Sequence, residues 1–162
     1  MKQFDQKKLA FIGLKLVERK ETIAVAESVS GGLFQFALSS IENAAQLFQG
    51  GITVYNTAQK FKHLQVEPVH ALEVNAVSQQ VANQMALHVQ HLFASHWGAG
   101  ITGYASPVPE SGGKTYAYFS IAYGHEIMCA GELKSSAEKP ADVQHYYIEA
   151  VISNLHDLLT SK

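Results

Sequence analysis

Hydrophobic and polar positions alternate along this chain in patterns that predict helices interleaved with short strands. Apolar residues at three-to-four spacing predict an amphipathic helix over residues 4–19. Residues 22–28 (TIAVAES) are apolar enough to predict a strand covered on both faces. Residues 31–41 return to a helical pattern, and residues 49–56 (QGGITVYN), with their β-branched side chains, indicate a second buried strand. The first third of the chain is therefore a helix followed by a strand, helix, strand unit.

The second half of the chain continues the alternation of helices and strands. Ser78 can cap a helix over residues 79–96, which should end near Trp97. Residues 98–106 follow as a third strand that enters a loop rich in glycine and proline. Residues 114–134 form two alternating runs, typical of a hairpin, and residues 142–159 predict a closing helix. The short segment 61–64 is left unassigned.

Helices interleaved with strands, together with one antiparallel hairpin turning at Gly124 and His125, define the expected fold class. The pattern predicts a three-layer α/β/α sandwich with a mixed, mostly parallel sheet. With 162 residues, the chain is long enough to bury a core without disulfides or metals. We therefore expect a single domain over residues 1–162.

Composition narrows the classes of partner and compartment. A net charge of −2 gives no electrostatic reason to expect nucleic acid or an anionic membrane as partner. No apolar run approaches the roughly 20 residues that span a bilayer, and the N-terminal MKQFDQKK lacks the apolar core of a signal peptide. The single cysteine, Cys129, excludes an internal disulfide framework. We expect a cytoplasmic protein.

Three polar segments follow predicted strands and compete for a ligand site. They are ESVSGG at residues 27–32, VYNTAQK at residues 54–60 and TGYASPVPESGG at residues 102–113. In open α/β sheets, ligands bind beyond the carboxyl ends of the strands, where loops and helix N-termini converge. The chemistry of the protein should lie where these segments meet.

The first segment can serve either a ligand or the fold. Gly31 and Gly32 allow a sharp turn that brings Ser30 and free backbone N–H groups close to an oxyanion or a phosphate. Alternatively, Ser30 is only a helix cap and the glycines only a turn. Glu27 is less easily explained, because a carboxylate that closes an apolar strand needs a partner.

The second segment adds a lysine and a tyrosine to a strand-end serine. Lys60 and Tyr55 beside such a serine are the parts of a serine-lysine hydrolase. Partial burial would lower the pKa of the lysine, so that its neutral amine could take the serine proton. Taken separately, Lys60 would be a solvated surface residue and Tyr55 a half-buried aromatic.

Histidine gives little reason to expect a metal centre. His88, His91 and His96 fall on or at the end of one predicted helix, but no HExxH pattern or cysteine cluster accompanies them. They are better interpreted as solvated helix residues. We expect no metal ligands and no cofactor.

Four ordered stretches resemble the CinA C-terminal domain family, whose active members are nicotinamide-nucleotide amidases. AESVSGG, GGITVYNTAQK, NAVSQQVANQMA and TGYASP correspond to the family patterns AESCTGG, GG-x-x-x-Y-S-N-E-A-K, G-A-V-S-x-x-V-A-x-x-M-A and T-G-I-A-G-P. The matches span residues 22–107. On this resemblance the chain is identified as a member of the family in its stand-alone form, without the N-terminal domain of the larger members.

The resemblance implies hydrolysis of nicotinamide mononucleotide to nicotinic acid mononucleotide and ammonia, a step of pyridine-nucleotide salvage. It places the nucleophile on Ser28 and the family tyrosine and lysine on Tyr55 and Lys60, with backbone N–H groups near residues 30–32 steadying the oxyanion. Ser30 lies close enough in sequence to compete as nucleophile. The positions expected to bind the substrate are Glu27, Ser30, Gly31, Gly32, Asn56, Thr102, Gly103, Tyr104 and Ser106.

This sequence departs from the family pattern on the side expected to hold the phosphate. The only arginine is Arg19, so the arginine of the family's G-D-R motif has no counterpart, and Lys134 or Lys139 would have to replace it. Tyr104 and Ser106 stand where the family has isoleucine and glycine. These changes leave two alternatives open: a catalytically degenerate relative that binds a nucleotide-like ligand, and an amidase for a different small amide. The resemblance also suggests a homodimer or higher homo-oligomer.

Overall fold

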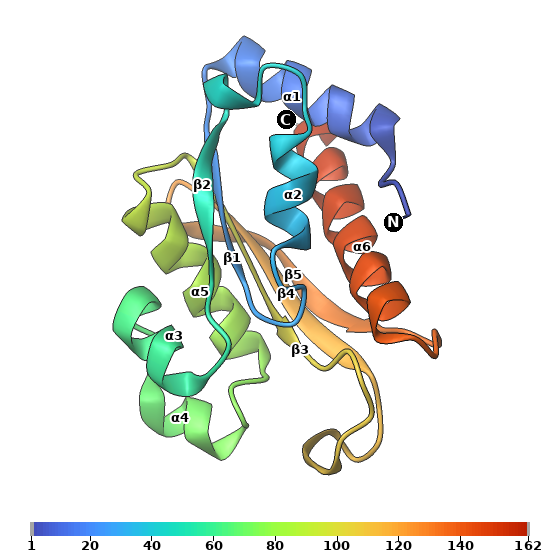
Figure 1. Ribbon diagram of the computed structural model, residues 1–162. Coiled ribbons are helices and arrows are strands. Elements are labelled where there is room, and N and C mark those ends of the chain that lie inside the picture. Colours follow the sequence, from blue (N-terminus) through green and yellow to red (C-terminus); the bar gives the residue numbers. More distant parts are fainter. Residues whose placement is uncertain (1, 162) are drawn as a thin grey trace.

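The computed structural model describes residues 2–161, in which helices and strands alternate much as expected (Figure 1). The strands are β1 (Ile23–Glu27), β2 (Phe48–Thr53), β3 (Trp97–Gly103), β4 (Tyr116–Tyr123) and β5 (Glu126–Lys134). The α-helices are α1 (Gln6–Arg19), α2 (Leu33–Ser39), α3 (Thr57–Leu64), α4 (Pro68–Glu73), α5 (Gln79–Leu92) and α6 (Pro140–Ser161). Two short 3-10 turns are η1 (Ala44–Gln46) and η2 (Pro109–Ser111).

The sheet is mixed and mostly parallel, which confirms the predicted fold class. Its strand order is β2-β1-β3-β4-β5. β1 pairs in parallel with both β2 and β3, whereas β4 is antiparallel to both β3 and β5. The predicted hairpin turns at Gly124 and His125, which both have positive φ as a tight two-residue hairpin turn requires. Only β4 therefore runs against the direction of the other strands.

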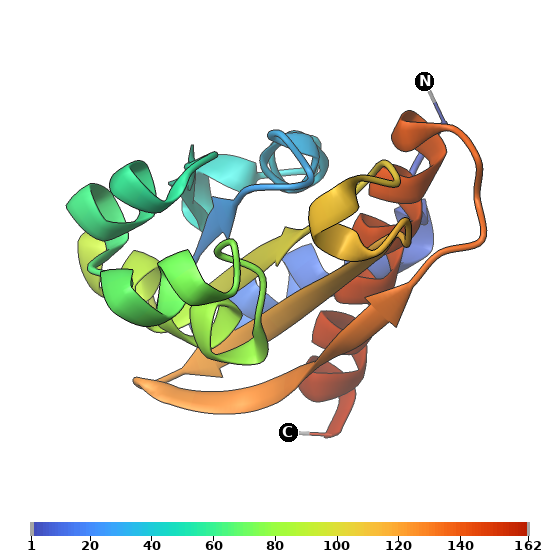
Figure 2. The ribbon, with the colours of Figure 1, turned by 90° about the horizontal axis from the view of Figure 1, so that it is seen from below.

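Helices cover both faces of the sheet and complete the three layers (Figures 1 and 2). On one face, apolar residues of α1, α2 and α6 pack against Ile23, Val25, Ile101 and Phe119. On the other face, α3, α4 and α5 pack against Ala24 and Ala26 of β1. β1 is buried along its whole length, as its continuous apolar run predicts.

Helix α5 lies unusually close to the sheet because β3 presents glycines to it. A Cβ built on Gly98 would overlap the carbonyl oxygen of Ala86, and one on Gly100 would come within 2.7 Å of the carbonyl oxygen of Ala82. The predicted cap is confirmed, since the side chain of Ser78 accepts a hydrogen bond from the Val81 N–H.

The sequence pattern misplaced the end of one helix and missed another helix, in both cases for local reasons. Helix α5 ends at Leu92 and not near Trp97, because Ala94 takes a left-handed conformation. Trp97 continues the helical spacing in the sequence, but it lies in the sheet as the first residue of β3. Its Nε1 donates a hydrogen bond to the carboxylate of Glu21 at 2.8 Å. Helix α4 was not predicted, although its sequence carries a Pro at the first turn.

The register of the sheet brings three strand ends together. Glu27, the last residue of β1, lies opposite Thr53 of β2 and Ile101 of β3. The segments that leave β1, β2 and β3 therefore start from the same edge, at the lower end of the molecule in Figure 1. Within residues 2–161, no helix has both the length and the apolar character needed to cross a bilayer.

Candidate active site

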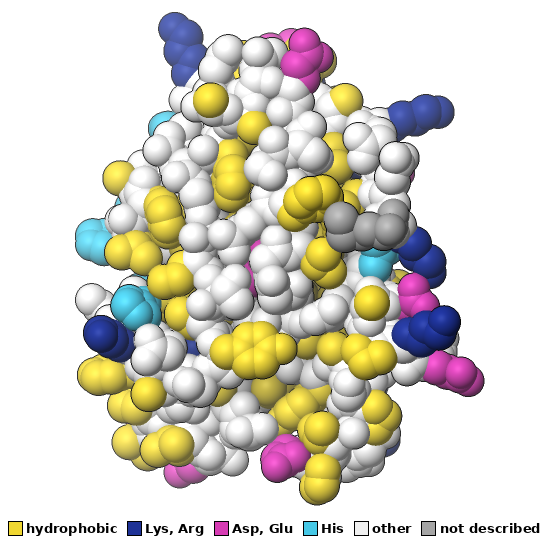
Figure 3. All heavy atoms as spheres, viewed as in Figure 1, with side chains coloured by type: hydrophobic (Ala, Val, Ile, Leu, Met, Phe, Trp, Pro, Cys, Tyr) yellow, Lys and Arg dark blue, Asp and Glu magenta, His cyan; other side chains and the backbone are white. Residues whose placement is uncertain are grey.

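A cleft of about 400 Å³ opens at this edge of the sheet, and residues from all three polar segments line it. Ser28 comes from the end of β1, Tyr55 and Lys60 from the segment after β2, and Thr102 from the end of β3. A fourth contribution, Asn75–Val77 from the loop before α5, was not singled out as a site segment from the sequence. In the space-filling view, apolar side chains form a row across this level of the surface (Figure 3).

Ser28 and Lys60 meet inside the cleft, 32 positions apart in sequence. The Nζ of Lys60 donates to the Oγ of Ser28 at 2.9 Å and to the carbonyl oxygen of Val54 at 3.0 Å. Asn56 begins α3 by accepting a hydrogen bond from the Gln59 N–H, which places Lys60 in the first turn of the helix. The side chain thus points back toward the end of β1.

Burial changes the acid-base properties of Lys60. The residue is only 1% exposed, and removal from water lowers its pKa from 10.5 to about 8. Among residues 2–161, no carboxylate lies within ion-pair distance of its ammonium group. The neutral amine is therefore accessible near physiological pH.

Glu27 does not face the cleft but caps helix α2. Its buried carboxylate accepts hydrogen bonds from the Ser30 hydroxyl at 2.5 Å and from the N–H groups of Gly32, Phe34 and Gln35 at 3.1, 3.1 and 2.7 Å. A carboxylate at a helix N-terminus satisfies the free N–H groups and interacts favourably with the helix dipole. This explains why an acidic residue ends the apolar strand.

This cap occupies most of the donors that the sequence suggested for a ligand. The Ser30 hydroxyl and the Gly32 N–H bind Glu27, and the Gly31 N–H donates to the carbonyl oxygen of Ser28 at 3.1 Å. None of Glu27, Ser30, Gly31 and Gly32 lines the cleft, whereas Ser28 does. Ser28 is thus the serine of this segment that a ligand in the cleft can reach.

Two backbone donors next to Ser28 remain available. The N–H groups of Val29 and Ser30 have no acceptor among the described residues. The turn that carries them is held from α6, where the Nε2 of Gln144 donates to the carbonyl oxygen of Val29 at 2.8 Å. Two such N–H groups beside a nucleophile can stabilise an oxyanion. The Ser30 N–H lies in the range 30–32 where such donors were expected, whereas Val29 lies just before it.

Tyr55 lies at the mouth of the cleft. Its residue is 69% exposed, and its hydroxyl has no hydrogen-bond partner within residues 2–161. Thr102 lies deeper, where its Oγ1 donates to the carbonyl oxygen of Ala76 at 2.7 Å. Tyr55 is therefore positioned to meet a ligand, while the hydroxyl of Thr102 is used to hold the loop before α5.

Tyr104 joins two walls of the cleft. Its hydroxyl accepts a hydrogen bond from the Nδ2 of Asn75 at 3.0 Å, and its carbonyl oxygen accepts one from the Tyr147 hydroxyl at 2.9 Å. Gly103 before it cannot be larger, because a Cβ there would lie 2.5 Å from Ala117. Ser106 also lines the cleft. The rim on this side is thus narrowed by an aromatic side chain fixed at both ends.

The lysines expected to replace the missing arginine lie outside the cleft. Lys134 ends β5 and lies 3.9 Å from the carboxylate of Glu132, while Lys139 is exposed just before α6. Arg19 is at the far end of α1, where it donates to the carbonyl oxygen of Leu159 at 3.0 Å. Lys60 is the cationic side chain that the cleft contains.

The histidines do not form a metal site. Among residues 2–161, no group of three or more His, Cys, Asp or Glu side chains is arranged to hold a metal ion. His88 contacts the carbonyl oxygen of Leu64 through Nδ1. His96 lies beyond the end of α5, and its Nδ1 accepts the Thr22 N–H at 3.0 Å. Its expected place on that helix is therefore wrong.

Comparison with known families gives an independent result. The sequence profile of the CinA C-terminal domain matches residues 5–159, nearly the whole chain. The chain belongs to the CinA C-terminal domain family. The resemblance inferred from four short motifs is thereby confirmed, and the match extends over α1 and α6, which carry none of those motifs.

Several curated relatives are CinA-like proteins. One from Picosynechococcus sp. is 40% identical over 112 residues, covering 69% of this chain and 27% of its own length. Another, from Cyanothece sp., is 37% identical over 143 residues, covering 88% of this chain and 31% of its own length. The chain thus spans about a third of the length of these relatives, the part that corresponds to the CinA C-terminal domain.

Solved structures of the family have the same fold. A competence or damage-inducible protein from Enterobacter asburiae superposes with a TM-score of 0.90 over 98% of this chain and 99% of its own, at 23% identity. A CinA superfamily protein from Klebsiella pneumoniae gives 0.91 over 99% and 100%, at 20% identity. At identities this low, the superposition shows that these proteins share a fold with this chain.

Proposed function

We propose that this CinA-family chain is an amidohydrolase that converts nicotinamide mononucleotide to nicotinic acid mononucleotide and ammonia. The observation that carries the proposal is the 2.9 Å contact between the buried Lys60 amine and the Ser28 hydroxyl in a cleft. A lysine whose pKa is lowered by burial is the base that a serine nucleophile requires when no histidine is present. Ser28 is the proposed nucleophile.

The first half of the proposed reaction forms an acyl-enzyme. Neutral Lys60 takes the proton of the Ser28 hydroxyl while Oγ forms a bond to the carboxamide carbon, and the carbonyl π electrons move to oxygen. The N–H groups of Val29 and Ser30 are the donors available for this oxyanion. The Lys60 ammonium then gives its proton to the amide nitrogen, the C–N bond breaks and ammonia leaves.

The second half hydrolyses the ester. Neutral Lys60 now takes a proton from water, whose oxygen attacks the acyl carbon through a second oxyanion. The C–O bond to Ser28 breaks, Oγ regains its proton from Lys60, and the product leaves as a carboxylic acid that gives its proton to solvent. Tyr55, at the cleft mouth, would orient the substrate and assist proton transfer with its unpartnered hydroxyl. The cycle consumes one water and needs no redox partner.

A second candidate substrate class is a smaller amide without a phosphate. The observation that favours it is the hydrogen bond from Asn75 to Tyr104, which narrows the rim, together with the positions of Lys134 and Lys139 outside the cleft. A phosphate bound here would have to rely on backbone N–H groups, hydroxyls or a rearranged lysine loop. The third alternative is that this chain binds a nucleotide-like ligand but does not hydrolyse it.

The test is ammonia release from millimolar nicotinamide mononucleotide by the purified chain, with nicotinamide and a panel of small amides beside it. We expect turnover that Ser28→Ala reduces at least about a thousandfold, since within residues 2–161 the Ser28 hydroxyl is the one that contacts Lys60. The control is Ser30→Ala, which removes a hydroxyl bonded only to Glu27 and should retain most of the activity if folded.

Each outcome selects one of the three functions. Turnover of the nucleotide that depends on Ser28 supports the proposal. Turnover of another amide alone, again dependent on Ser28, selects the second substrate class. A folded protein that binds the nucleotide but releases no ammonia from any amide overturns the assignment as an enzyme.

A further inference from the structure

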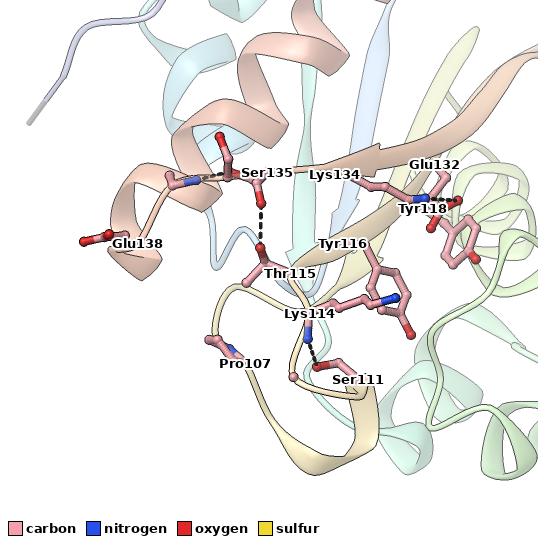
Figure 4. A pocket seen from close by; sticks show the side chains of 13 residues that line it. Pro107, Ser111, Lys114, Thr115, Tyr116, Tyr118, Glu132, Lys134, Ser135 and Glu138 are labelled. Atoms are coloured by element: carbon pink, nitrogen blue, oxygen red, sulfur yellow. Dashed lines mark hydrogen bonds and ion pairs between the residues drawn. The ribbon is translucent and has the colours of Figure 1, made fainter.

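A second hollow, larger than the cleft, lies between the loop after β3 and the segment that joins β5 to α6 (Figure 4). Its volume is about 810 Å³. The floor comes from β4 and β5 through Tyr116, Tyr118 and Lys134, and the sides come from Lys114 and residues 135–138. None of the residues that line it lines the Ser28 cleft, so the proposed hydrolysis leaves this hollow without a role.

Two tyrosine rings give the hollow an aromatic wall. Tyr116 and Tyr118 are two residues apart on β4 and therefore project from the same face of the sheet. Their ring centroids lie 6.0 Å apart in an edge-to-face arrangement, and the ring of Tyr104 makes a similar contact with Tyr116 at 5.3 Å. Both rings are only partly buried, and their hydroxyls have no partner within residues 2–161. Because the two rings are nearly perpendicular, a flat ring can stack on one of them and meet the other at its edge.

The charges around the wall leave one cation uncompensated. Lys134 is 3.9 Å from the carboxylate of Glu132, so these two charges largely offset each other. Glu138 points away from the tyrosines, whereas Lys114 extends alongside Tyr116 (Figure 4). In the part of the chain that the structure describes, the ammonium of Lys114 forms no ion pair or hydrogen bond. The inner side of the hollow is therefore suited to one anionic group.

We propose that this hollow is a binding site for a small molecule that combines a planar ring with one anionic group, either a carboxylate or a phosphate. The ring packs on Tyr116 and Tyr118, and the anionic group accepts hydrogen bonds from Lys114 and from the tyrosine hydroxyls. Lys114 is a freely rotating point charge, so the site accepts either anion. The carboxylate of Glu132 nearby disfavours ligands with more than one anionic group.

The experiment is a titration of the ¹⁵N-labelled full chain followed by NMR, with benzoate and phenyl phosphate as probes. Benzamide serves as the ring without charge, and acetate and inorganic phosphate serve as the charge without the ring. We expect benzoate, phenyl phosphate or both to shift the amide signals of residues 113–118 and 134–138 at millimolar concentration. The relative affinities of the two probes distinguish a carboxylate ligand from a phosphate ligand.

Three variants distinguish a specific binding site from non-specific attraction of anions to lysine side chains. Lys114→Met should weaken binding of the charged probes about tenfold and leave benzamide unchanged, because it removes one charge-assisted contact. Lys7→Met, which removes an exposed cation from α1, should change neither. Tyr118→Leu should weaken all three ring-bearing probes by removing part of the wall.

Several results would overturn the proposal. They are the absence of shifts in these two segments with both charged ring probes, equal affinity in Lys114→Met and Lys7→Met, and shifts confined to Ser28 and residues 55–60. Acetate or inorganic phosphate binding as well as the ring-bearing probes would also contradict it. None of these measurements depends on turnover. The proposed binding site can therefore be disproved while the proposed hydrolase activity is supported, and the activity can be disproved while the binding site is supported.

Discussion

At the scale of single residues, the chemistry depends on a lysine placed where lysine is rarely found. Fully buried lysines are uncommon unless they are paired, and Lys60 has a hydroxyl and a carbonyl as partners instead of a carboxylate. Burial of Lys60 without a carboxylate partner therefore lowers the stability of the fold and yields an amine that loses its proton easily. This cost is understandable if the amine works as a base.

The pH dependence of activity should follow the titration of Lys60. Because its pKa is about 8, only about a tenth of the molecules carry the neutral amine at pH 7. We expect kcat/KM for ammonia release to rise about tenfold per pH unit below pH 8 and to level off above it. Lys60→Met should abolish turnover, whereas Lys62→Met, two residues later and exposed, should keep the profile. A rate independent of pH between 6 and 9 would contradict this role.

The same pKa shift should appear in the stability of the fold. The pKa of Lys60 is lowered on folding, so the unfolded chain binds more protons between pH 8 and 10.5. The free energy of unfolding should therefore rise with pH in this window, by on the order of 3 kcal/mol in total from this residue. Urea denaturation at pH 7 to 9.5 measures the early part of the rise. The rise should be smaller in Lys60→Met than in the parent chain, and equal slopes in both would exclude the lysine as its source.

The positions of the polar segments after two buried strands predicted that a serine and Lys60 would lie close together, whereas the choice of Ser28 over Ser30 came from the family resemblance. Glu27 was placed among the substrate-binding positions, whereas the structure has it capping α2. A carboxylate at a strand end can bind a ligand or cap the next helix, and only the three-dimensional course of residues 28–35 decides between the two. The sequence likewise gave no means to tell that Lys134 and Lys139 would lie outside the cleft, since that depends on where β5 ends in space.

At the scale of elements, the junction between β1 and α2 is stabilised by one side chain. Glu27→Gln should destabilise the fold by about 2 to 4 kcal/mol, because an amide cannot accept hydrogen bonds at both ends from Ser30, Gly32 and Gln35. Thermal unfolding measures this loss. Glu42→Gln is the matched control, as Glu42 is exposed, and it should change stability by less than about 0.5 kcal/mol. Similar small effects in both variants would show that the cap is dispensable.

The contact between β3 and α5 leaves no room for a methyl group. Gly98→Ala should cost about 3 kcal/mol or more, since its Cβ would overlap the backbone carbonyl of Ala86, which cannot move without shifting the helix. Gly112→Ala is the comparison. It lies in open space and carries only the strain of a positive φ, worth about 1 kcal/mol. Denaturant midpoints of the two variants measure the difference, and an equal loss in both would show that the packing is looser than described.

The order and type of most elements could be predicted, while their ends could not. Hydrophobic periodicity reports which side of an element is buried, and Phe93 and Trp97 continue the four-residue spacing of Val81, Met85 and Val89, although Trp97 is buried in the sheet. The period alone therefore extended the helix across the turn at Ala94. Helix α4 is too short, at six residues, to display a period.

At the scale of the whole molecule, the homo-oligomer suggested by the family resemblance stays a prediction. Exposed large apolar side chains lie on α3 and α4, at Phe61, Val69 and Leu72, and surfaces of this kind are often covered by a partner. We expect light scattering after gel filtration to give a mass of at least twice 17.7 kDa. A mass of one chain at micromolar concentration would contradict it.

The position of Trp97 has a practical consequence for all of these measurements. It is the only tryptophan of the chain, it is fully buried at the start of β3, and its ring lies 4.6 Å from that of Tyr123. The start of β3 is the opposite end of the sheet from Ser28. Its fluorescence emission should therefore shift to longer wavelength when the core opens and stay unchanged when a ligand enters the cleft. The molecule carries its own optical reporter of unfolding, separate in space from its proposed chemistry.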